Sequence, residues 1–159
     1  MNTAYLLLGS NMGNSRRQLQ TAIFSIDKKI GKIIRQSALY STAAWGNINQ
    51  PDFLNQVIIV VSEHTAIELL HHILAIEKMM GRVRTIKNAP RIIDIDILFF
   101  NKQIFSEKQL TVPHPEIQNR RFVLTPLNEL SPNFKHPVLM KSIHQLLLVC
   151  PDNLNVKKF

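Results

Sequence analysis

The stretch Pro90-Arg91-Ile92-Ile93-Asp94-Ile95-Asp96-Ile97-Leu98-Phe99-Phe100 predicts a β-strand, because nearly every residue in it is β-branched or aromatic. Side chains alternate across a strand, so Asp94 and Asp96 should share one face. The opposite face should then carry Ile93, Ile95, Ile97 and Phe99. The two acids start about 6.6 Å apart, so their carboxylates can converge on one cation. Such a pair on a half-buried strand needs a neutralising partner, and Mg²⁺ in nucleotide-phosphate chemistry fits that need.

A basic segment comes directly before the two acids and contains Arg82, Arg84, Lys87 and Arg91. Arginines suit a polyphosphate because their planar guanidinium groups donate several hydrogen bonds at once. The same arginines could instead form simple salt bridges with Asp94 and Asp96, which is the structural alternative. A P-loop is excluded, because the run from Gly9 to Asn14 lacks the required lysine, and the chain has no dinucleotide-binding glycine fingerprint.

The rest of the first hundred residues predicts three more strands and two helices. Apolar runs indicate strands over residues 4–8, 33–40 and 53–61, with a loop over 41–52. Helices are expected from Ser15, with Gln18 at capping-box spacing, to Gly31, and from Thr65, capped with Glu68, to Met80. Gly81 is then the expected residue after the second helix. The order β-α-β-β-α-β predicts an α+β, ferredoxin-like fold.

In that fold a mainly antiparallel sheet has both helices on one face. The isoleucines of the 90–100 stretch should pack on those helices, and the acids should lie on the opposite, open face. A C-terminal extension should add short strands at 103–105 and 110–112 and a helix over 138–148.

Composition indicates one globular domain over residues 1–159. Apolar residues make up 45% of the chain and the net charge is +8, which suits either a nucleic acid or a small polyphosphate. Cys150 is the only cysteine, so an intrachain disulfide and a thiolate zinc site are excluded. No targeting segment or membrane span is evident, and a cytoplasmic location is expected.

Two further groups could bind a ligand. Phe53 and Asn55 lie two apart on one expected strand, so they share a face and could stack a flat heterocycle and hydrogen-bond to its edge. Taken alone, this pair is more typical of packing. His114 lies in a proline-rich turn near the basic pair Arg120 and Arg121, where a structural histidine is the commoner case.

Together these pieces resemble the 6-hydroxymethyl-7,8-dihydropterin pyrophosphokinase family of folate biosynthesis. The matching motifs occur in the family's order over nearly the whole chain: Gly9-Ser10-Asn11, Gln50-Pro51-Asp52-Phe53-Leu54-Asn55, Gly81-Arg82-Val83-Arg84, Pro90-Arg91 with Asp94-Ile95-Asp96-Ile97, Leu110-Thr111-Val112-Pro113-His114, and Asn119-Arg120 with Phe122.

The resemblance implies transfer of the terminal diphosphate of ATP to the pterin hydroxymethyl group, with release of AMP. It implies two Mg²⁺ ions on Asp94 and Asp96, with Arg82 and Arg91 as catalytic arginines that act on developing charge. ATP would contact Glu77, Arg84, Arg91, Ile97, Thr111, His114 and Arg120. The pterin would lie between Phe53 and Phe122 and also contact Thr42, Ala43, Trp45, Asn55 and Asp94. A monomer that binds neither nucleic acid nor membrane is expected.

Two alternatives are of a different kind. The chain could be an inactive relative that binds pterin or nucleotide without turnover, or a basic ferredoxin-like module that binds RNA. RNA binding on a sheet needs exposed aromatic residues on its central strands. Here Asp94 and Asp96 would occupy that face and repel phosphate unless a metal neutralised them.

Overall fold

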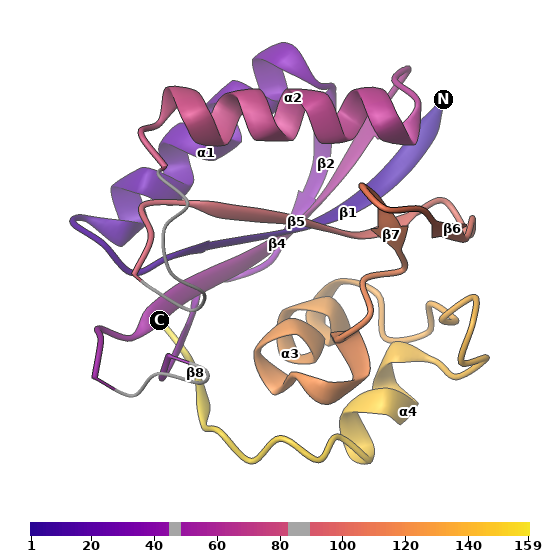
Figure 1. Cartoon of the computed structure of the whole chain (residues 1–159). Helices are drawn as coiled ribbons and strands as arrows, with labels where there is room; N and C mark the ends of the chain where they lie inside the picture. Colours follow the sequence, from indigo (N-terminus) through magenta and orange to yellow (C-terminus); the bar gives the residue numbers. More distant parts are fainter. Residues whose placement is uncertain (45–48, 83–89) are drawn as a thin grey trace.

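The computed structural model describes residues 1–44, 49–82 and 90–159, and its centre is an antiparallel sheet (Figure 1). Its strands run in the order β5 (Asp94–Phe100), β1 (Asn2–Ser10), β4 (Phe53–Ser62), β3 (Tyr40–Thr42) and β8 (Val156–Lys158), and β2 (Lys32–Gln36) also pairs with β4. Every pairing in this sheet is antiparallel. The predicted α+β, ferredoxin-like order is confirmed.

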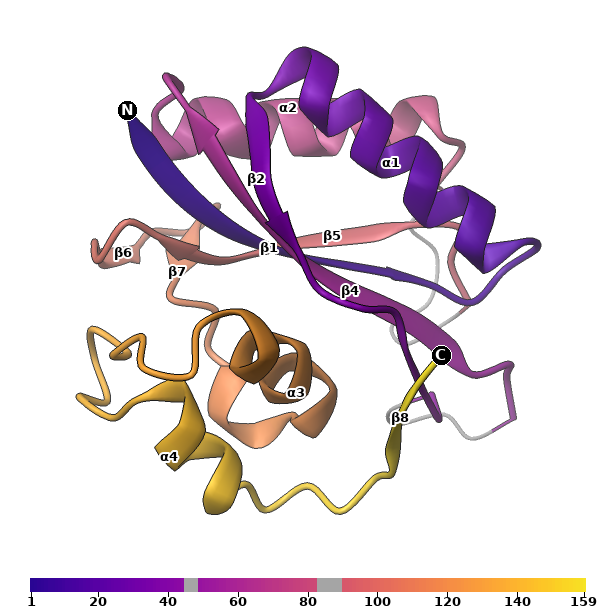
Figure 2. The same ribbon diagram turned by 180° about the vertical axis from the view of Figure 1, so that it is seen from behind.

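Helices α1 (Ser15–Lys29) and α2 (Ala66–Met79) lie side by side on one face of the sheet, as both views show (Figures 1 and 2). Their buried apolar stripes meet the sheet in one core cluster, to which Ile93, Ile95 and Ile97 also belong, as predicted. The capping box of Thr65 and Glu68 is confirmed. The cap of α1 differs from the prediction, because the Asn14 side chain, not Ser15, accepts the bond from the Arg17 amide.

The opposite face is not open along its whole length, which corrects the prediction. Helices α3 (Arg121–Leu130) and α4 (Ile143–Leu148) cover part of it and enclose a second core (Figure 2). Helix α3, whose interior holds Pro126, was not predicted from the sequence. Proline lacks the amide hydrogen that a helix uses and normally argues against one. Helix α4 also starts later than predicted, because Met140 has a positive φ of 58° and Ser142 caps the first turn.

Strand β5 contains a bulge that the alternation rule could not predict. Ile97 pairs with Leu6 and Phe99 with Tyr5, so β5 has one extra residue, Leu98, between these pairs. A bulge shifts the following side chains to the other face. Phe99 therefore packs in the second core, with Leu98, and its predicted place beside Ile97 was wrong.

Three smaller differences concern the connections. The predicted strand over 33–40 is divided into β2 and β3, so residues 41 and 42 belong to a strand and not to the loop. The extension forms the hairpin β6 (Phe105–Ser106) with β7 (Thr111–Val112), followed by a short 3₁₀ turn, η1 (Ile117–Asn119). Within the described ranges, every helix is too short or too polar to span a membrane.

Gly31, which follows α1, generates a prediction about stability. A Cβ at this position would lie 2.2 Å from the Val61 carbonyl oxygen, a backbone atom that cannot move aside. We expect Gly31→Ala to cost about 3 kcal/mol of unfolding free energy, at the upper end of overpacking effects. Gly13→Ala is the control, because its Cβ would make only an ordinary contact with the Gln18 side chain, at 3.8 Å, and the positive φ of 64° opposes it at about 1 kcal/mol. If urea denaturation shows equal losses of unfolding free energy in the two variants, the proposed clash with the Val61 carbonyl is wrong.

Candidate active site

The register of three strands brings the predicted ligand-binding residues into one row. Gly9 on β1 pairs with Asn55 on β4 and with Asp94 on β5. Paired residues in a sheet point to the same face, so the polar groups of Asn55 and Asp94 flank a glycine. A Cβ on Gly9 would lie 2.7 Å from the Asn55 side-chain oxygen, so glycine leaves the space that this row needs.

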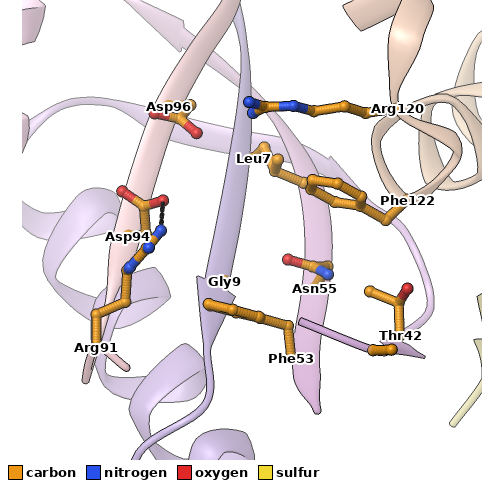
Figure 3. A pocket seen from close by; sticks show the side chains of 11 residues that line it. Leu7, Gly9, Thr42, Phe53, Asn55, Arg91, Asp94, Asp96, Arg120 and Phe122 are labelled. Atoms are coloured by element: carbon orange, nitrogen blue, oxygen red, sulfur yellow. Dashed lines mark hydrogen bonds and ion pairs between the residues drawn. The ribbon is translucent and has the colours of Figure 1, made fainter. Parts of the chain in front are cut away.

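A cavity open to solvent lies over this row (Figure 3). Phe53 on β4 and Phe122 on α3 lie on either side of Asn55, and Asp94 and Asp96 lie on the cavity side of β5. The lining residues are Leu7, Gly9, Thr42, Ala43, Phe53, Asn55, Arg91, Asp94, Asp96, Arg120 and Phe122. The cavity thus combines aromatic walls with acidic and basic groups.

Two buried polar atoms in this cavity are unpaired. The side-chain nitrogen of Asn55 and the hydroxyl of Thr42 have no hydrogen-bond partner in the described part of the chain. Buried polar groups without partners cost free energy, so such atoms commonly mark a position where a ligand binds. Aromatic walls together with unpaired polar atoms suit a flat, polar-edged molecule.

Asp94 is neutralised by two arginines. Its Oδ1 accepts a bond of 2.5 Å from Arg82, and its Oδ2 accepts one of 3.0 Å from Arg91. Arg91 also lies over the Phe53 ring, 5.2 Å from the ring centre. Asp94 therefore forms the ion pairs that were named as the structural alternative.

Asp96 has a different environment. Among the described residues no hydrogen bond or ion pair reaches its carboxylate. Burial, with the nearby charges of Asp94 and Glu77, raises the pKa of Asp96 to about 7, although Arg120 and Arg82 act in the opposite direction. The Arg120 guanidinium points toward this carboxylate across the cavity (Figure 3).

The acidic pair fits Mg²⁺ better than a metal held by protein alone. No group of three or more histidine, cysteine or acidic side chains suited to a metal occurs in the residues that the structure describes. Mg²⁺ in nucleotide enzymes usually takes one or two carboxylates and completes its shell with phosphate oxygens and water. Asp94 and Asp96 match that donor set.

Glu77 on α2 contacts Arg82, the same arginine that contacts Asp94. The residue is only 3% exposed, and its carboxylate accepts bonds from Arg82 at 2.7 Å and from the Ile95 amide at 2.8 Å. It thereby fixes both the guanidinium that contacts Asp94 and the start of β5.

A second cavity, lined in part by Asp96, lies against α2, β5 and β7. It brings together four residues that were predicted to contact ATP, namely Glu77, Ile97, Thr111 and His114. Burial, with a smaller effect of Arg120, lowers the pKa of His114, and its Nδ1 accepts a bond from the Glu116 amide. A neutral ring bonded in this way carries its proton on Nε2. Among the described residues, Asp96 is the one that lines both cavities.

Most predicted site residues gather in these two cavities, with some differences. Arg120, predicted to contact ATP, lines the first cavity with the residues predicted to contact the pterin. Trp45 and Arg84 lie outside the described residues. Leu7 and Gly9 line the first cavity but were not predicted, although the glycine that ends an apolar run was a usable signal.

Comparisons with known proteins agree on one family. Residues 5–132 match the family described as 7,8-dihydro-6-hydroxymethylpterin-pyrophosphokinase (HPPK). The 2-amino-4-hydroxy-6-hydroxymethyldihydropteridine pyrophosphokinase of Aquifex aeolicus is 39% identical over 91% of this chain and 90% of that protein. The enzyme of the same name from Pseudomonas aeruginosa is 36% identical over 92% of this chain and 91% of its own length.

Other similar proteins are much longer. Folic acid synthesis protein fol1 of Schizosaccharomyces pombe is 39% identical over 94% of this chain, which spans only 20% of that protein. Among solved structures, a Plasmodium falciparum HPPK-DHPS with pteroate has a TM-score of 0.77 at 22% identity, over 92% of this chain and 44% of that one. This structural likeness supports the fold.

The raised pKa of Asp96 predicts how stability depends on pH. The folded state binds the Asp96 proton more tightly than the unfolded state, so in EDTA the unfolding free energy should fall as pH rises from about 4 through 7. Asp96→Asn lacks this ionisation. The unfolding free energy of Asp96→Asn should therefore exceed that of the natural chain by more at pH 8 than at pH 5. The two differences should themselves differ by more than about 1.4 kcal/mol, the equivalent of one pKa unit. Asp27→Asn, an exposed change on α1, is the control in urea denaturation. If the difference in unfolding free energy between Asp96→Asn and the natural chain is equal at the two pH values, the environment described for Asp96 is wrong.

Proposed function

The chain belongs to the 7,8-dihydro-6-hydroxymethylpterin-pyrophosphokinase family, and we propose that it transfers the terminal diphosphate of ATP to the hydroxymethyl group of 6-hydroxymethyl-7,8-dihydropterin. AMP is the second product, and the reaction belongs to folate biosynthesis. One observation carries the proposal for this chain: Asp96, beside Asp94, lies where an aromatic cavity and a second polar cavity meet. A reaction that joins two substrates needs such a junction.

The first cavity is the proposed pterin site. Phe53 and Phe122 would stack on the two faces of the flat ring system. The unpaired Asn55 nitrogen and Thr42 hydroxyl would hydrogen-bond to its polar edge, close to Ala43 and Asp94. Trp45 stays a prediction from the family resemblance alone.

The second cavity is the proposed ATP site. Ile97 and Thr111 line it, and His114 would donate a hydrogen bond through Nε2. Arg91 and Arg120 would approach the phosphates from the first cavity. Glu77, predicted as an ATP contact, already bonds Arg82 and the Ile95 amide, so we assign it to holding the arginine in place. Arg84 stays a prediction from the resemblance.

Asp94 and Asp96 would hold Mg²⁺, and the number of two ions is part of the proposal. Bound there, the metal would neutralise phosphate charge and orient the reacting groups. Asp94 already bonds two arginines, whereas the described residues give the Asp96 carboxylate no hydrogen bond or ion pair, so Asp96 gains more from a cation.

The chain's own contribution is positioning and electrostatic stabilisation. A bond forms between the pterin hydroxymethyl oxygen and the β-phosphorus of ATP, and the bond from that phosphorus to the oxygen of the α-phosphate breaks. The hydroxyl group releases its proton to solvent, and AMP leaves with the electron pair of the broken bond. Arg82 and Arg91 lie beside Asp94 and would stabilise charge on the transferred group.

A single domain, a monomeric state, a cytoplasmic location and the absence of nucleic-acid binding stay predictions. The RNA-binding alternative is not favoured by the family match. An inactive relative would have the same fold, so turnover must be measured.

The deciding experiment mixes purified protein with ATP, Mg²⁺ and the reduced pterin and separates the nucleotides. Equimolar AMP and pterin diphosphate are expected, with neither formed when pterin or Mg²⁺ is omitted. ADP as the main product would indicate transfer of one phosphate instead. An absence of AMP, with both ligands bound in calorimetry, would identify an inactive relative.

Arg91→Ala tests the role of the arginine that contacts Asp94. A donor aimed at developing charge contributes mainly in the transition state, and losing one typically costs about 3 kcal/mol, or roughly a hundredfold in rate. We expect kcat to fall by that order with a small change in the KM for ATP. Arg17→Ala, which removes an exposed arginine from α1, is the charge control. If only the KM for ATP rises, Arg91 contributes to ground-state binding.

Asn55→Leu tests the pterin site. Because the buried side-chain nitrogen is unpaired in the free protein, a similar-sized apolar side chain should leave unfolding free energy unchanged or slightly raised. Pterin affinity should fall at least tenfold in calorimetry, and affinity for a non-hydrolysable ATP analogue should not change. Normal pterin binding by this variant would sink the assignment of the first cavity.

A further inference from the structure

Asn11 is buried just after β1, with only 3% of its surface exposed, and its side chain is fully bonded. Its Oδ1 accepts a bond of 2.9 Å from the Arg91 amide. Its Nδ2 donates to the Gln50 side-chain oxygen at 2.7 Å and to the Pro51 carbonyl at 3.1 Å. The Asn11 amide also donates to the Arg91 carbonyl at 3.1 Å, so Asn11 and Arg91 are joined by two bonds.

These contacts fix the orientation of the Asn11 side chain. The Arg91 amide can only donate, and the Pro51 carbonyl can only accept. The oxygen of Asn11 must therefore face Arg91, and its nitrogen must face Pro51. No other side chain of this size offers one acceptor and two donors in that arrangement.

Three segments that are distant in the sequence meet at this one side chain. Pro51 lies two residues before Phe53, an aromatic wall of the first cavity. Arg91 lies three residues before Asp94 and contacts it through its guanidinium, which also lies over the Phe53 ring. Asn11 itself does not line either cavity described above, so it has no direct access to a ligand there.

We propose that Asn11 is a positioning residue that fixes Arg91 relative to Phe53, and so aligns the phosphate-side arginine with the bound pterin. This inference rests on the proposed function. The bonds of Asn11 form two groups. The bonds to Arg91 govern the rate of transfer, and the bonds to Gln50 and Pro51 govern the position of Phe53 and therefore the binding of pterin.

Two variants separate the effects of these two groups of bonds. Asn11→Ala removes both, so kcat should fall at least tenfold and the KM for pterin should rise at least threefold, with the KM for ATP changing less than threefold. Asn11→Asp keeps the acceptor for the Arg91 amide but places an oxygen against the Pro51 carbonyl. It should recover most of the kcat lost in Asn11→Ala and keep the raised KM for pterin.

Ser62→Ala is the matched control for lost buried hydrogen bonds. Ser62 is equally buried, donates to the Ile30 carbonyl and accepts from the His64 amide, at the other end of β4. This variant should lose stability and keep kcat within twofold. If kcat of Asn11→Ala also stays within twofold, or if Asn11→Asp recovers none of the loss, the positioning role is wrong.

A measurement on the free protein separates this inference from the proposed function. Amide hydrogen exchange should show the Arg91 amide protected in the natural chain and in Asn11→Asp, and at least tenfold less protected in Asn11→Ala. Equal protection in all three would overturn the inference even if the enzyme is active. Absence of turnover by the natural chain, with the expected exchange pattern, would overturn the proposed function and leave Asn11 as the link between these segments.

Discussion

The register of β1 against its two neighbours is the constraint on which the rest of the site depends. Gly9 is paired with Asn55 on one side and Asp94 on the other, so the amide, the glycine and the acid form a row across three strands. A slip by one residue would turn every side chain of a strand to the other face. The apolar residues that pack under α1 and α2 make such a slip costly, so the core that stabilises the sheet also fixes the geometry of the site.

The charges of the site are distributed unequally. Asp94 has two arginine partners, and Glu77 anchors one of those arginines from the opposite side. Burial and two acidic neighbours raise the pKa of Asp96 to about 7, against the smaller opposing effect of Arg120 and Arg82. In the free protein this arrangement opposes stability at neutral pH. Such local cost is common where residues are held ready for a ligand.

Local patterns predicted the sheet, both covering helices and the shared face of Asp94 and Asp96, because alternation and capping depend on near neighbours. They failed where distant contacts decide the outcome. The bulge at Leu98 depends on the partner strand, and so Phe99 was assigned to the wrong face. Helix α3 tolerates Pro126 because its apolar residues pack in the second core. The two cavities likewise require residues from separate elements, and the family motifs, not periodicity, brought them together.

Strand β8 has a consequence for the edge of the sheet. It pairs with β3, whose three residues include Thr42, and the partners Tyr40 and Lys158 are more than a hundred positions apart. The register of β3 is already set by its local pairing with β4, in which Thr42 lies opposite Phe53. The Thr42 side of the first cavity therefore needs no contact with the distant end of the chain, and β8 instead covers the backbone groups that β3 would otherwise expose as an edge strand.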